Sequence, residues 1–211
     1  DSIAPLKTHD NLLRDFRREV ETFQPDVILV SAVESTVTFT REILSSILDL
    51  KIPHVLGGVF ATYAPELAIN FPEVDVICVG EGENILAKLV MKIKKGESLR
   101  NIPNIWYKDK EGHITKEGMS SPINLDDLPR FDVSPFDESR FCRAMAGKVY
   151  RMFPVETHRG CPMRCTFCNS PVQEEAYKRE TGMSYFRQRS IPEVMEDIRY
   201  FVEECKAEYL F

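Results

Sequence analysis

The stretch VLGGVFATYAPELAINFPEVDVICVGEGENILAKLV, residues 55–90, alternates between short apolar runs and longer helical patterns. Its run VDVICV at 74–79 is almost continuously apolar, which is typical of a strand that is buried on both faces. Residues 64–71 and 84–96 have the apolar spacing of helices, and Gly96 predicts a C-cap for the second helix. Buried strands separated by helices predict an α/β fold, a parallel sheet with helices on both sides.

The same alternation extends towards the N-terminus. Residues 11–23 and 39–50 have helical spacing, the apolar run DVILV at 26–30 lies between them, and residues 52–58 predict a further strand. Right-handed crossovers place all strand-to-helix loops at one edge of a parallel sheet, which is where open α/β sheets bind ligands. We therefore expect three loops to meet at a binding rim: residues 31–38, 57–62 and 80–84.

The pattern changes after the helix at 84–96. Residues 104–116 predict a β-hairpin around the turn KDKEG, and residues 118–143 have no sustained period. We therefore predict three parts: an α/β domain with a terminal hairpin at 1–117, a linker at 118–148 and a second domain at 149–211. The chain starts at Asp1 without a methionine and stops in an apolar run, so we expect both domains to be incomplete.

The second domain begins with one β/α unit. Residues 150–160 predict a strand, residues 190–205 a helix, and residues 207–211 the next strand. Ser190 and Glu193 have the spacing of a capping box at the start of that helix. A single unit of this kind is too small to close a core by itself.

Three cysteines lie between this strand and this helix, in RGCPMRCTFCNSP at 159–171. Their CxxxCxxC spacing lacks the fourth ligand of a structural zinc site, differs from the CxxCxxC run of bacterial ferredoxins, and would leave one thiol idle in a redox CxxC pair. The remaining interpretation is an iron–sulfur cluster in which one iron has no protein ligand. A zinc loop completed by His158 or by a distant cysteine is the alternative. The other cysteines are predicted to be buried apolar residues: Cys78, Cys142 and Cys205.

The segment CPMRCTFC resembles the CxxxCxΦC signature of the radical S-adenosylmethionine superfamily, in which Φ is an aromatic residue, here Phe167. The resemblance implies a partial TIM barrel and a [4Fe–4S] cluster whose open iron binds S-adenosylmethionine, with Phe167 against the adenine. It also implies reductive cleavage of the sulfonium to a 5′-deoxyadenosyl radical that acts on a small-molecule substrate. An electron donor such as flavodoxin or ferredoxin would be a partner. The implied cluster ligands are Cys161, Cys165 and Cys168.

Residues 55–90, the hairpin and the segment LDDLPRFD at 125–132 resemble the N-terminal part of radical S-adenosylmethionine enzymes that carry a cobalamin-binding domain. This resemblance implies a flavodoxin-like, Rossmann-type sheet that presents a corrinoid, and many such enzymes transfer methyl groups to unactivated carbon or phosphorus. The candidate cobalamin-binding residues at the predicted rim are Ser31, Ser35, Thr36, Gly57, Gly58, Gly80, Glu81 and Gly82.

The glycines among these candidates allow close backbone approach, and the hydroxyl groups are candidates for hydrogen bonds to the amide arms or the nucleotide tail. Alternatively, each glycine serves only to form a turn. Glu81 and Glu83 have their own alternatives, which are solvated carboxylates of a loop or, for Glu83, a cap near the start of a helix. No DxHxxG sequence occurs, so no histidine is identified as a lower ligand of cobalt. We expect His54 to be a packed core residue.

Four charged residues near the cysteines have two possible roles. His158 and Arg159 either tune the cluster and meet the carboxylate of the cofactor or are solvated. Arg187 and Arg189 either position the cofactor or cover a helix end.

Composition limits the class of protein. Apolar residues make up 43% of the chain and charged residues 28%, with a formal net charge of -6, which argues against a nucleic-acid surface. No apolar run has the length of a membrane span, so we expect a cytoplasmic protein.

The prediction is a radical S-adenosylmethionine enzyme that uses cobalamin for methyl transfer. The alternatives are a cyclase, isomerase or methylthiotransferase without cobalamin, and a non-catalytic corrinoid- or zinc-binding module. A methylthiotransferase usually has a second cysteine triad in its N-terminal domain. It is disfavoured because only Cys78 precedes the predicted linker.

Overall fold

A computed structural model describes residues 9–211 of the chain except residue 110. It divides into two compact units, an N-terminal unit up to Ser120 and a C-terminal unit at Ser121–Phe211. Each unit has its own β-structure and its own hydrophobic core.

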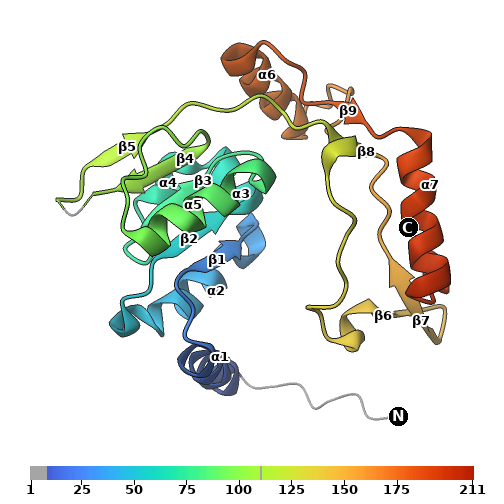
Figure 1. Cartoon of the computed structure of the whole chain (residues 1–211), viewed down its shortest axis with the longest axis horizontal. Helices are drawn as coiled ribbons and strands as arrows, with labels where there is room; N and C mark the ends of the chain where they lie inside the picture. The colour runs from blue at the N-terminus through green and yellow to red at the C-terminus, as the bar shows by residue number, and fades with distance from the viewer. Residues whose placement is uncertain (1–8, 110) are drawn as a thin grey trace. The chain divides into compact units, whose positions relative to one another are not determined.

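The N-terminal unit is built on one five-stranded sheet. The strands follow each other in space as they do in the sequence (Figure 1): β1 (Ile28–Ser31), β2 (His54–Gly57), β3 (Val76–Cys78), β4 (Ile105–Lys108) and β5 (Ile114–Lys116). The first three strands are parallel, and β4 and β5 form an antiparallel hairpin that pairs with β3. The predicted α/β fold with a terminal hairpin is confirmed.

Helices cover both faces of this sheet: α1 (His9–Phe23), α2 (Glu34–Ser45), α3 (Gly58–Tyr63), α4 (Pro65–Ile69) and α5 (Glu83–Lys95), with a short 3-10 turn η1 (Leu48–Leu50). Strand side chains alternate between faces, so Leu56 and Ile77 pack in one core cluster with residues of α2, α3 and α4. Val55, Val76 and Cys78 pack in the other cluster with residues of α5. The predicted layers of helix, sheet and helix are therefore present.

Two local predictions in this unit are confirmed, and one helix starts earlier than predicted. Gly96 follows α5 with a φ of 65°, which confirms the predicted glycine C-cap. His54 is 1% exposed and its Nδ1 lies 2.8 Å from the carbonyl oxygen of Glu73, so it is the packed core residue that we expected. The apolar spacing predicted a helix from residue 39, but α2 begins at Glu34. Its first turn was not predicted because it is exposed and has no apolar spacing.

The C-terminal unit has a small sheet in which β7 (Lys148–Phe153) pairs antiparallel with β6 (Cys142–Met145) and parallel with β10 (Tyr209–Leu210). Helix α7 (Ile191–Arg199) and the π-helical turn η4 (Tyr200–Glu204) precede β10, which gives the predicted β/α unit. The strand predicted at 150–160 is shorter, because β7 ends at Phe153 and residues 154–157 form no strand before the cysteine loop. The remaining elements are β8 (His158–Arg159), α6 (Ser170–Thr181), β9 (Arg187–Gln188) and the 3-10 turns η2 (Leu125–Asp127) and η3 (Glu138–Phe141).

The residues after Ser120 pack with this second unit. Phe141 stacks on Phe153 with ring centroids 4.7 Å apart, and Phe153 stacks on Phe201 at 4.9 Å. The segment between residues 121 and 148, predicted as part of a linker, thus contributes β6, η3 and an aromatic core residue to the unit.

Two predictions in this unit were wrong, and one helix was not predicted. Ser190 is the N-cap of α7, but its side chain forms no capping hydrogen bond, and its own N–H donates to Asp126 Oδ1 at 2.9 Å. Cys142 is exposed on β6, whereas Cys78 and Cys205 are buried as predicted. Helix α6 had no helical signal in the sequence because Tyr177 is its one buried residue.

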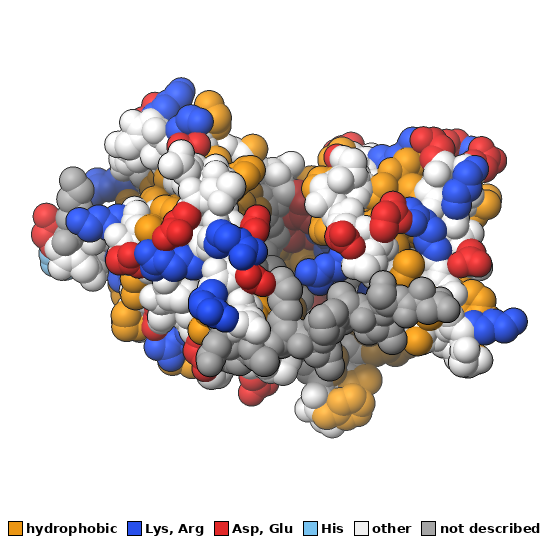
Figure 2. Space-filling model, turned by 90° about the horizontal axis from the view of Figure 1, so that it is seen from below, with side chains coloured by type: hydrophobic (Ala, Val, Ile, Leu, Met, Phe, Trp, Pro, Cys, Tyr) orange, Lys and Arg blue, Asp and Glu red, His pale blue; other side chains and the backbone are white. Residues whose placement is uncertain are grey.

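The surface is mixed in charge. On the face in Figure 2, basic side chains lie among acidic ones, in line with ion pairs such as that of Arg17 with Asp49 at 2.7 Å. None of the described helices is long and apolar enough to cross a lipid bilayer.

Candidate cofactor sites

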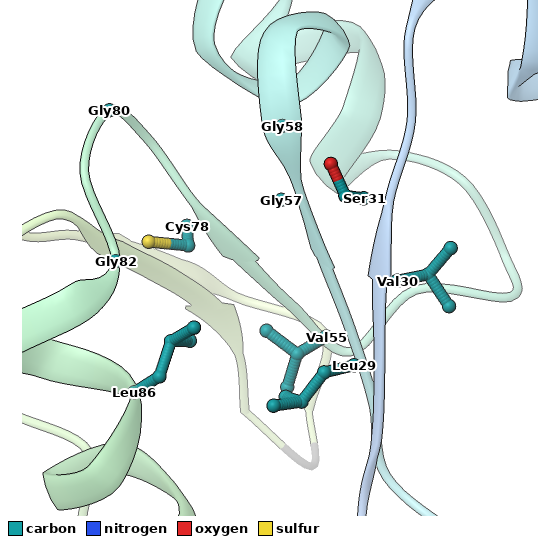
Figure 3. A pocket seen from close by; sticks show the side chains of 10 residues that line it. All are labelled: Leu29, Val30, Ser31, Val55, Gly57, Gly58, Cys78, Gly80, Gly82 and Leu86. Carbon is teal, nitrogen blue, oxygen red and sulfur yellow. The ribbon is translucent and has the colours of Figure 1, made fainter. Parts of the chain in front are cut away.

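The ends of the three parallel strands form a cavity of about 280 Å³ in the N-terminal unit. Figure 3 shows Leu29, Val55 and Leu86 converging towards one end of it, with Ser31 beside the glycine pair towards the other. The lining residues are Leu29, Val30, Ser31, Val55, Gly57, Gly58, Cys78, Gly80, Gly82 and Leu86. The three predicted loops therefore meet at the carboxyl edge of the sheet, as crossover handedness requires.

Strand register explains which side chains face the cavity. Leu29 pairs with Val55, and two residues later Ser31 pairs with Gly57, so these residues share one face of the sheet. Cys78 ends the next strand on the same face, where burial and the nearby carboxylate of Glu83 raise the pKa of its thiol to about 11. The thiol is therefore neutral at physiological pH.

The glycine pair has two different functions in the backbone. Gly58 has a φ of 86°, and a Cβ there would lie 2.5 Å from Ser31 Oγ and 2.9 Å from the backbone of Ala32, so the turn requires glycine. At Gly57, a Cβ would lie 3.8 Å from Cys78 Cβ, which is ordinary contact. Glycine at 57 keeps space open in the cavity and is not needed to relieve strain.

Two side chains hold the rim loops together. Thr62 Oγ1 accepts the N–H of Gly80 at 3.0 Å and donates to the carbonyl oxygen of Gly58 at 2.9 Å. Asn104, which is 0% exposed, donates from Nδ2 to the carbonyl oxygen of Glu81 at 2.8 Å. Neither residue was predicted as functional, because neither lies in a sequence motif that is typical of a residue supporting a loop.

The structure brings five of the predicted cobalamin residues to the cavity: Ser31, Gly57, Gly58, Gly80 and Gly82. Ser35, Thr36 and Glu81 are not among the lining residues. Thr36 instead caps α2, since its Oγ1 accepts the N–H of Val33 at 3.1 Å. The apolar lining residues were not predicted, because apolar residues in strands and helices are typical of core: Leu29, Val30, Val55, Cys78 and Leu86.

The cysteine loop connects β8 to α6 in the C-terminal unit. Cys161 and Cys168 are partly buried and Cys165 is exposed. Cys168 Sγ accepts the N–H of Ser170 at 3.4 Å, and hydrogen bonds from Ser170 lower the pKa of this thiol. The loop thus favours a thiolate at its last cysteine.

One end of the cysteine loop rests on a neighbouring segment. Gly160 precedes Cys161 with a φ of 87°, and a Cβ there would lie 2.9 Å from Phe186 Cα and 3.0 Å from the carbonyl oxygen of Tyr185. Glu174 of α6 fixes that segment, because its Oε2 accepts the N–H of Tyr185 at 2.7 Å and of Phe186 at 3.2 Å.

Glu174 is held as a carboxylate. Burial opposes its ionisation, but the hydrogen bonds from Lys178, Ser184 and the two backbone N–H groups outweigh that effect and lower its pKa to about 2. The segment beside Gly160 is thus tied to α6 by charge-assisted hydrogen bonds.

The charged residues near the loop have partners in the same unit. Arg159 Nε donates to Glu156 Oε1 at 3.0 Å, and Arg159 pairs with Arg187 in the ladder between β8 and β9. Arg189 forms an ion pair with Asp197 of α7, which supports the helix-covering alternative for this arginine. Phe167 is 92% exposed, so its aromatic face is open to a ligand.

The comparisons with known proteins agree with this arrangement. Residues 3–90 match the family model of the B12 binding domain. The chain is 29% identical over 170 residues to an uncharacterised methyltransferase of Pyrococcus horikoshii, covering 78% of this chain and 36% of that protein. It is 22% identical over 229 residues to the cytidylyl-2-hydroxyethylphosphonate methyltransferase of Streptomyces wedmorensis, covering 92% of this chain and 41% of that protein.

A solved structure shows the same fold. The cobalamin-dependent S-adenosylmethionine radical enzyme OxsB, with aqua-cobalamin and S-adenosylmethionine bound, matches with a TM-score of 0.65 and 21% identity, over 94% of this chain and 26% of that one. The chain therefore spans less than half the length of each of these proteins. The predicted resemblance to radical S-adenosylmethionine enzymes with a cobalamin-binding domain is confirmed.

Proposed function

We propose that this chain is part of a cobalamin-dependent radical S-adenosylmethionine enzyme, in which the N-terminal unit binds cobalamin and the cysteine loop binds a [4Fe–4S] cluster. The observation that carries the proposal is the glycine-lined cavity at the carboxyl edge of the sheet, within the region that matches the B12 binding domain. The cysteine loop supports the second half of the proposal independently.

The cavity fits one part of cobalamin. Pockets that enclose drug-sized ligands measure about 300–1,000 Å³, and a corrinoid is larger than such ligands. A cavity of about 280 Å³ therefore holds the nucleotide tail, while the corrin ring stays outside it at the rim. Gly58 and Gly80 leave the rim backbone uncovered there, and the hydroxyl of Ser31 is available for a hydrogen bond.

The cysteine loop fits a cluster with an open iron. Three thiolates come from Cys161, Cys165 and Cys168. Hydrogen bonds from Ser170 lower the pKa of the Cys168 thiol and so favour its thiolate form. Phe167 offers an exposed ring for stacking on the adenine of S-adenosylmethionine. When bound, the cluster supplies the electron that splits the sulfonium, and cobalamin supplies a carrier for a methyl group.

The reaction class follows from the same pairing. We infer methyl transfer to an unactivated carbon or phosphorus centre of a small molecule, in a cytoplasmic enzyme that receives its electron from flavodoxin or ferredoxin. The two methyltransferases among the relatives support this class. A cyclase or isomerase would use the same cluster without moving a methyl group, so labelled S-adenosylmethionine distinguishes them by whether the label enters the product.

The binding half of the proposal is tested by anaerobic reconstitution of the protein with iron, sulfide and hydroxocobalamin. We expect a brown protein with four irons per chain, the EPR signal of a reduced cubane cluster that changes when S-adenosylmethionine is added, and cobalamin that co-elutes with it. A colourless protein that retains zinc would contradict the cluster, and cobalamin that elutes separately would contradict the cobalamin site.

A further inference from the structure

The lining of the cavity bears on which form of the corrinoid cofactor the N-terminal unit binds. The inference drawn from it rests on the cobalamin site proposed above. Cobamides share one corrin ring and differ in the base of the nucleotide tail, which is a benzimidazole in cobalamin and adenine in other members of the class. We propose that the cavity of the N-terminal unit prefers a benzimidazole tail and disfavours an adenine tail.

The lining is almost entirely without hydrogen-bonding side chains. Of the ten residues that line the cavity, none is charged and Ser31 carries the only hydroxyl. Leu29 and Val55 face it from adjacent strands, and Leu86 faces it from α5. Such a surface matches the hydrocarbon edge of a benzimidazole.

Backbone groups at the rim are largely used within the protein. The N–H of Gly80 and the carbonyl oxygen of Gly58 both bond Thr62, and the carbonyl oxygen of Glu81 accepts from Asn104. The carbonyl oxygen of Gly57 accepts the N–H of Ala32 at 3.1 Å. The N–H of Gly80 is therefore not available to an incoming base, and each of these carbonyl oxygens already accepts one hydrogen bond that holds the rim.

Adenine carries an exocyclic amino group and ring nitrogens on the edge where cobalamin carries hydrocarbon. The ring nitrogens need donors, and the lining side chains offer only the hydroxyl of Ser31 and the weakly donating thiol of Cys78. The cost of a ring nitrogen that stays unpaired in this cavity corresponds to about a tenfold to hundredfold loss of affinity. Sites discriminate most strongly when a polar group is buried without its partner.

The decisive experiment compares three corrinoids on the same protein: cobalamin, the adenine-tailed cobamide and cobinamide, which has no nucleotide tail. We expect cobalamin to bind about tenfold to hundredfold more tightly than the adenine-tailed form in equilibrium dialysis, and cobinamide to bind more weakly than cobalamin. Equal affinity for the two tails would overturn the selectivity. Cobinamide that binds as tightly as cobalamin would overturn entry of the tail.

Failure of the cobalamin site itself has a different result, because then none of the three corrinoids binds. That outcome contradicts the proposed function together with the inference. Binding of all three corrinoids with the same affinity contradicts only the inferred preference for the tail and is consistent with the cobalamin site.

Two variants locate the selectivity in the cavity. Gly57→Ala adds a methyl that the fold accepts, since its Cβ lies 3.8 Å from Cys78 Cβ, so it should weaken cobalamin and leave cobinamide unchanged. Gly118→Ala is the matched control, because a Cβ at that position meets no atom within 4 Å. Leu86→Gln places an amide in the wall and should narrow the preference between the two tails. A preference that Leu86→Gln does not change would place the selectivity elsewhere, and cobalamin affinity that Gly57→Ala does not change would contradict entry of the tail.

Discussion

The rim of the cavity and the cysteine loop both depend on a glycine in the left-handed region, but they are held in different ways. At the rim, Gly58 is locked against Ser31, and Thr62 and Asn104 bond the neighbouring loops. The cysteine loop rests on Tyr185 and Phe186 at one end only, and Cys165 is exposed. The rim is thus held by contacts within the protein, whereas we expect the proposed cluster to add order to the cysteine loop.

The largest expected effect is on the cysteine loop. Cys165→Ala removes one of the three proposed cluster ligands, and we expect nearly complete loss of bound iron and of the visible absorbance. Cobalamin binding should persist, since the cavity lies in the other unit. Cys142→Ala is the control, being an exposed cysteine outside the loop. Unchanged iron per chain in Cys165→Ala would show that the loop does not hold the cluster.

A smaller effect is expected at the rim. Gly58→Ala forces a side chain into the left-handed region against Ser31 and Ala32. We therefore expect the free energy of unfolding, measured in urea, to fall by at least about 1–3 kcal/mol, which is the cost of such backbone strain. Gly96→Ala has the same kind of φ, but its Cβ meets no atom within 4 Å. It should therefore be less destabilising than Gly58→Ala. Equal losses would mean that the contact with Ser31 contributes nothing.

The support beneath the cysteine loop gives the next effect. Glu174→Gln replaces charge-assisted hydrogen bonds to the segment at 184–186 with neutral ones, and we expect a loss of up to about 1.5–3 kcal/mol. Reconstituted iron should also be released faster on dilution into chelator. Glu175→Gln on the same helix is the control, because Glu175 is exposed and lies 3.8 Å from Arg164.

The same carboxylate predicts a pH dependence. The pKa of Glu174 is lowered from 4.5 to about 2, so its stabilisation is complete above 4.5 and is lost as the pH falls towards 2. The stability difference between the native protein and Glu174→Gln should therefore shrink over that range. A difference that stays constant from neutral pH to pH 2 would contradict the role of the charge.

The smallest effect is a difference in thiol reactivity between the two regions. In the protein without metal, the thiol of Cys168 has a lowered pKa and should be alkylated at pH 8. Cys78 has a pKa of about 11, so it should react slowly at pH 8 and faster only at higher pH. Mass spectrometry after timed alkylation measures both sites in one sample. Faster labelling of Cys78 than of Cys168 would reverse the comparison.

The sequence predicted the parts of the molecule that depend on local patterns. The three parallel strands, the hairpin and the glycine C-cap were read from apolar spacing and turn residues. Helix α6 was missed because it buries only Tyr177, and α2 was started late because its first turn is exposed. Both errors arise where a helix lacks an apolar face.

The same limit applies to the sites. The glycines of the rim were found because they stand directly after strands, but Leu86 and Cys78 could not be told from core until the cavity was seen. Thr62 and Asn104 act through contacts with residues far away in the sequence, which spacing does not reveal. Register between strands, and not any motif, decides which apolar residues face the ligand.

Asn104 has a consequence beyond the rim. Its single planar carboxamide donates to Glu81 and, through Oδ1, accepts the N–H of Ser120 at 2.7 Å, so one rigid group joins the loop over the cavity to the last residue of the N-terminal unit. A rotation of that amide would break both bonds together. We therefore expect hydrogen exchange at the N–H of Ser120 to slow when a ligand in the cavity orders the loop, so this backbone position can report on the cavity.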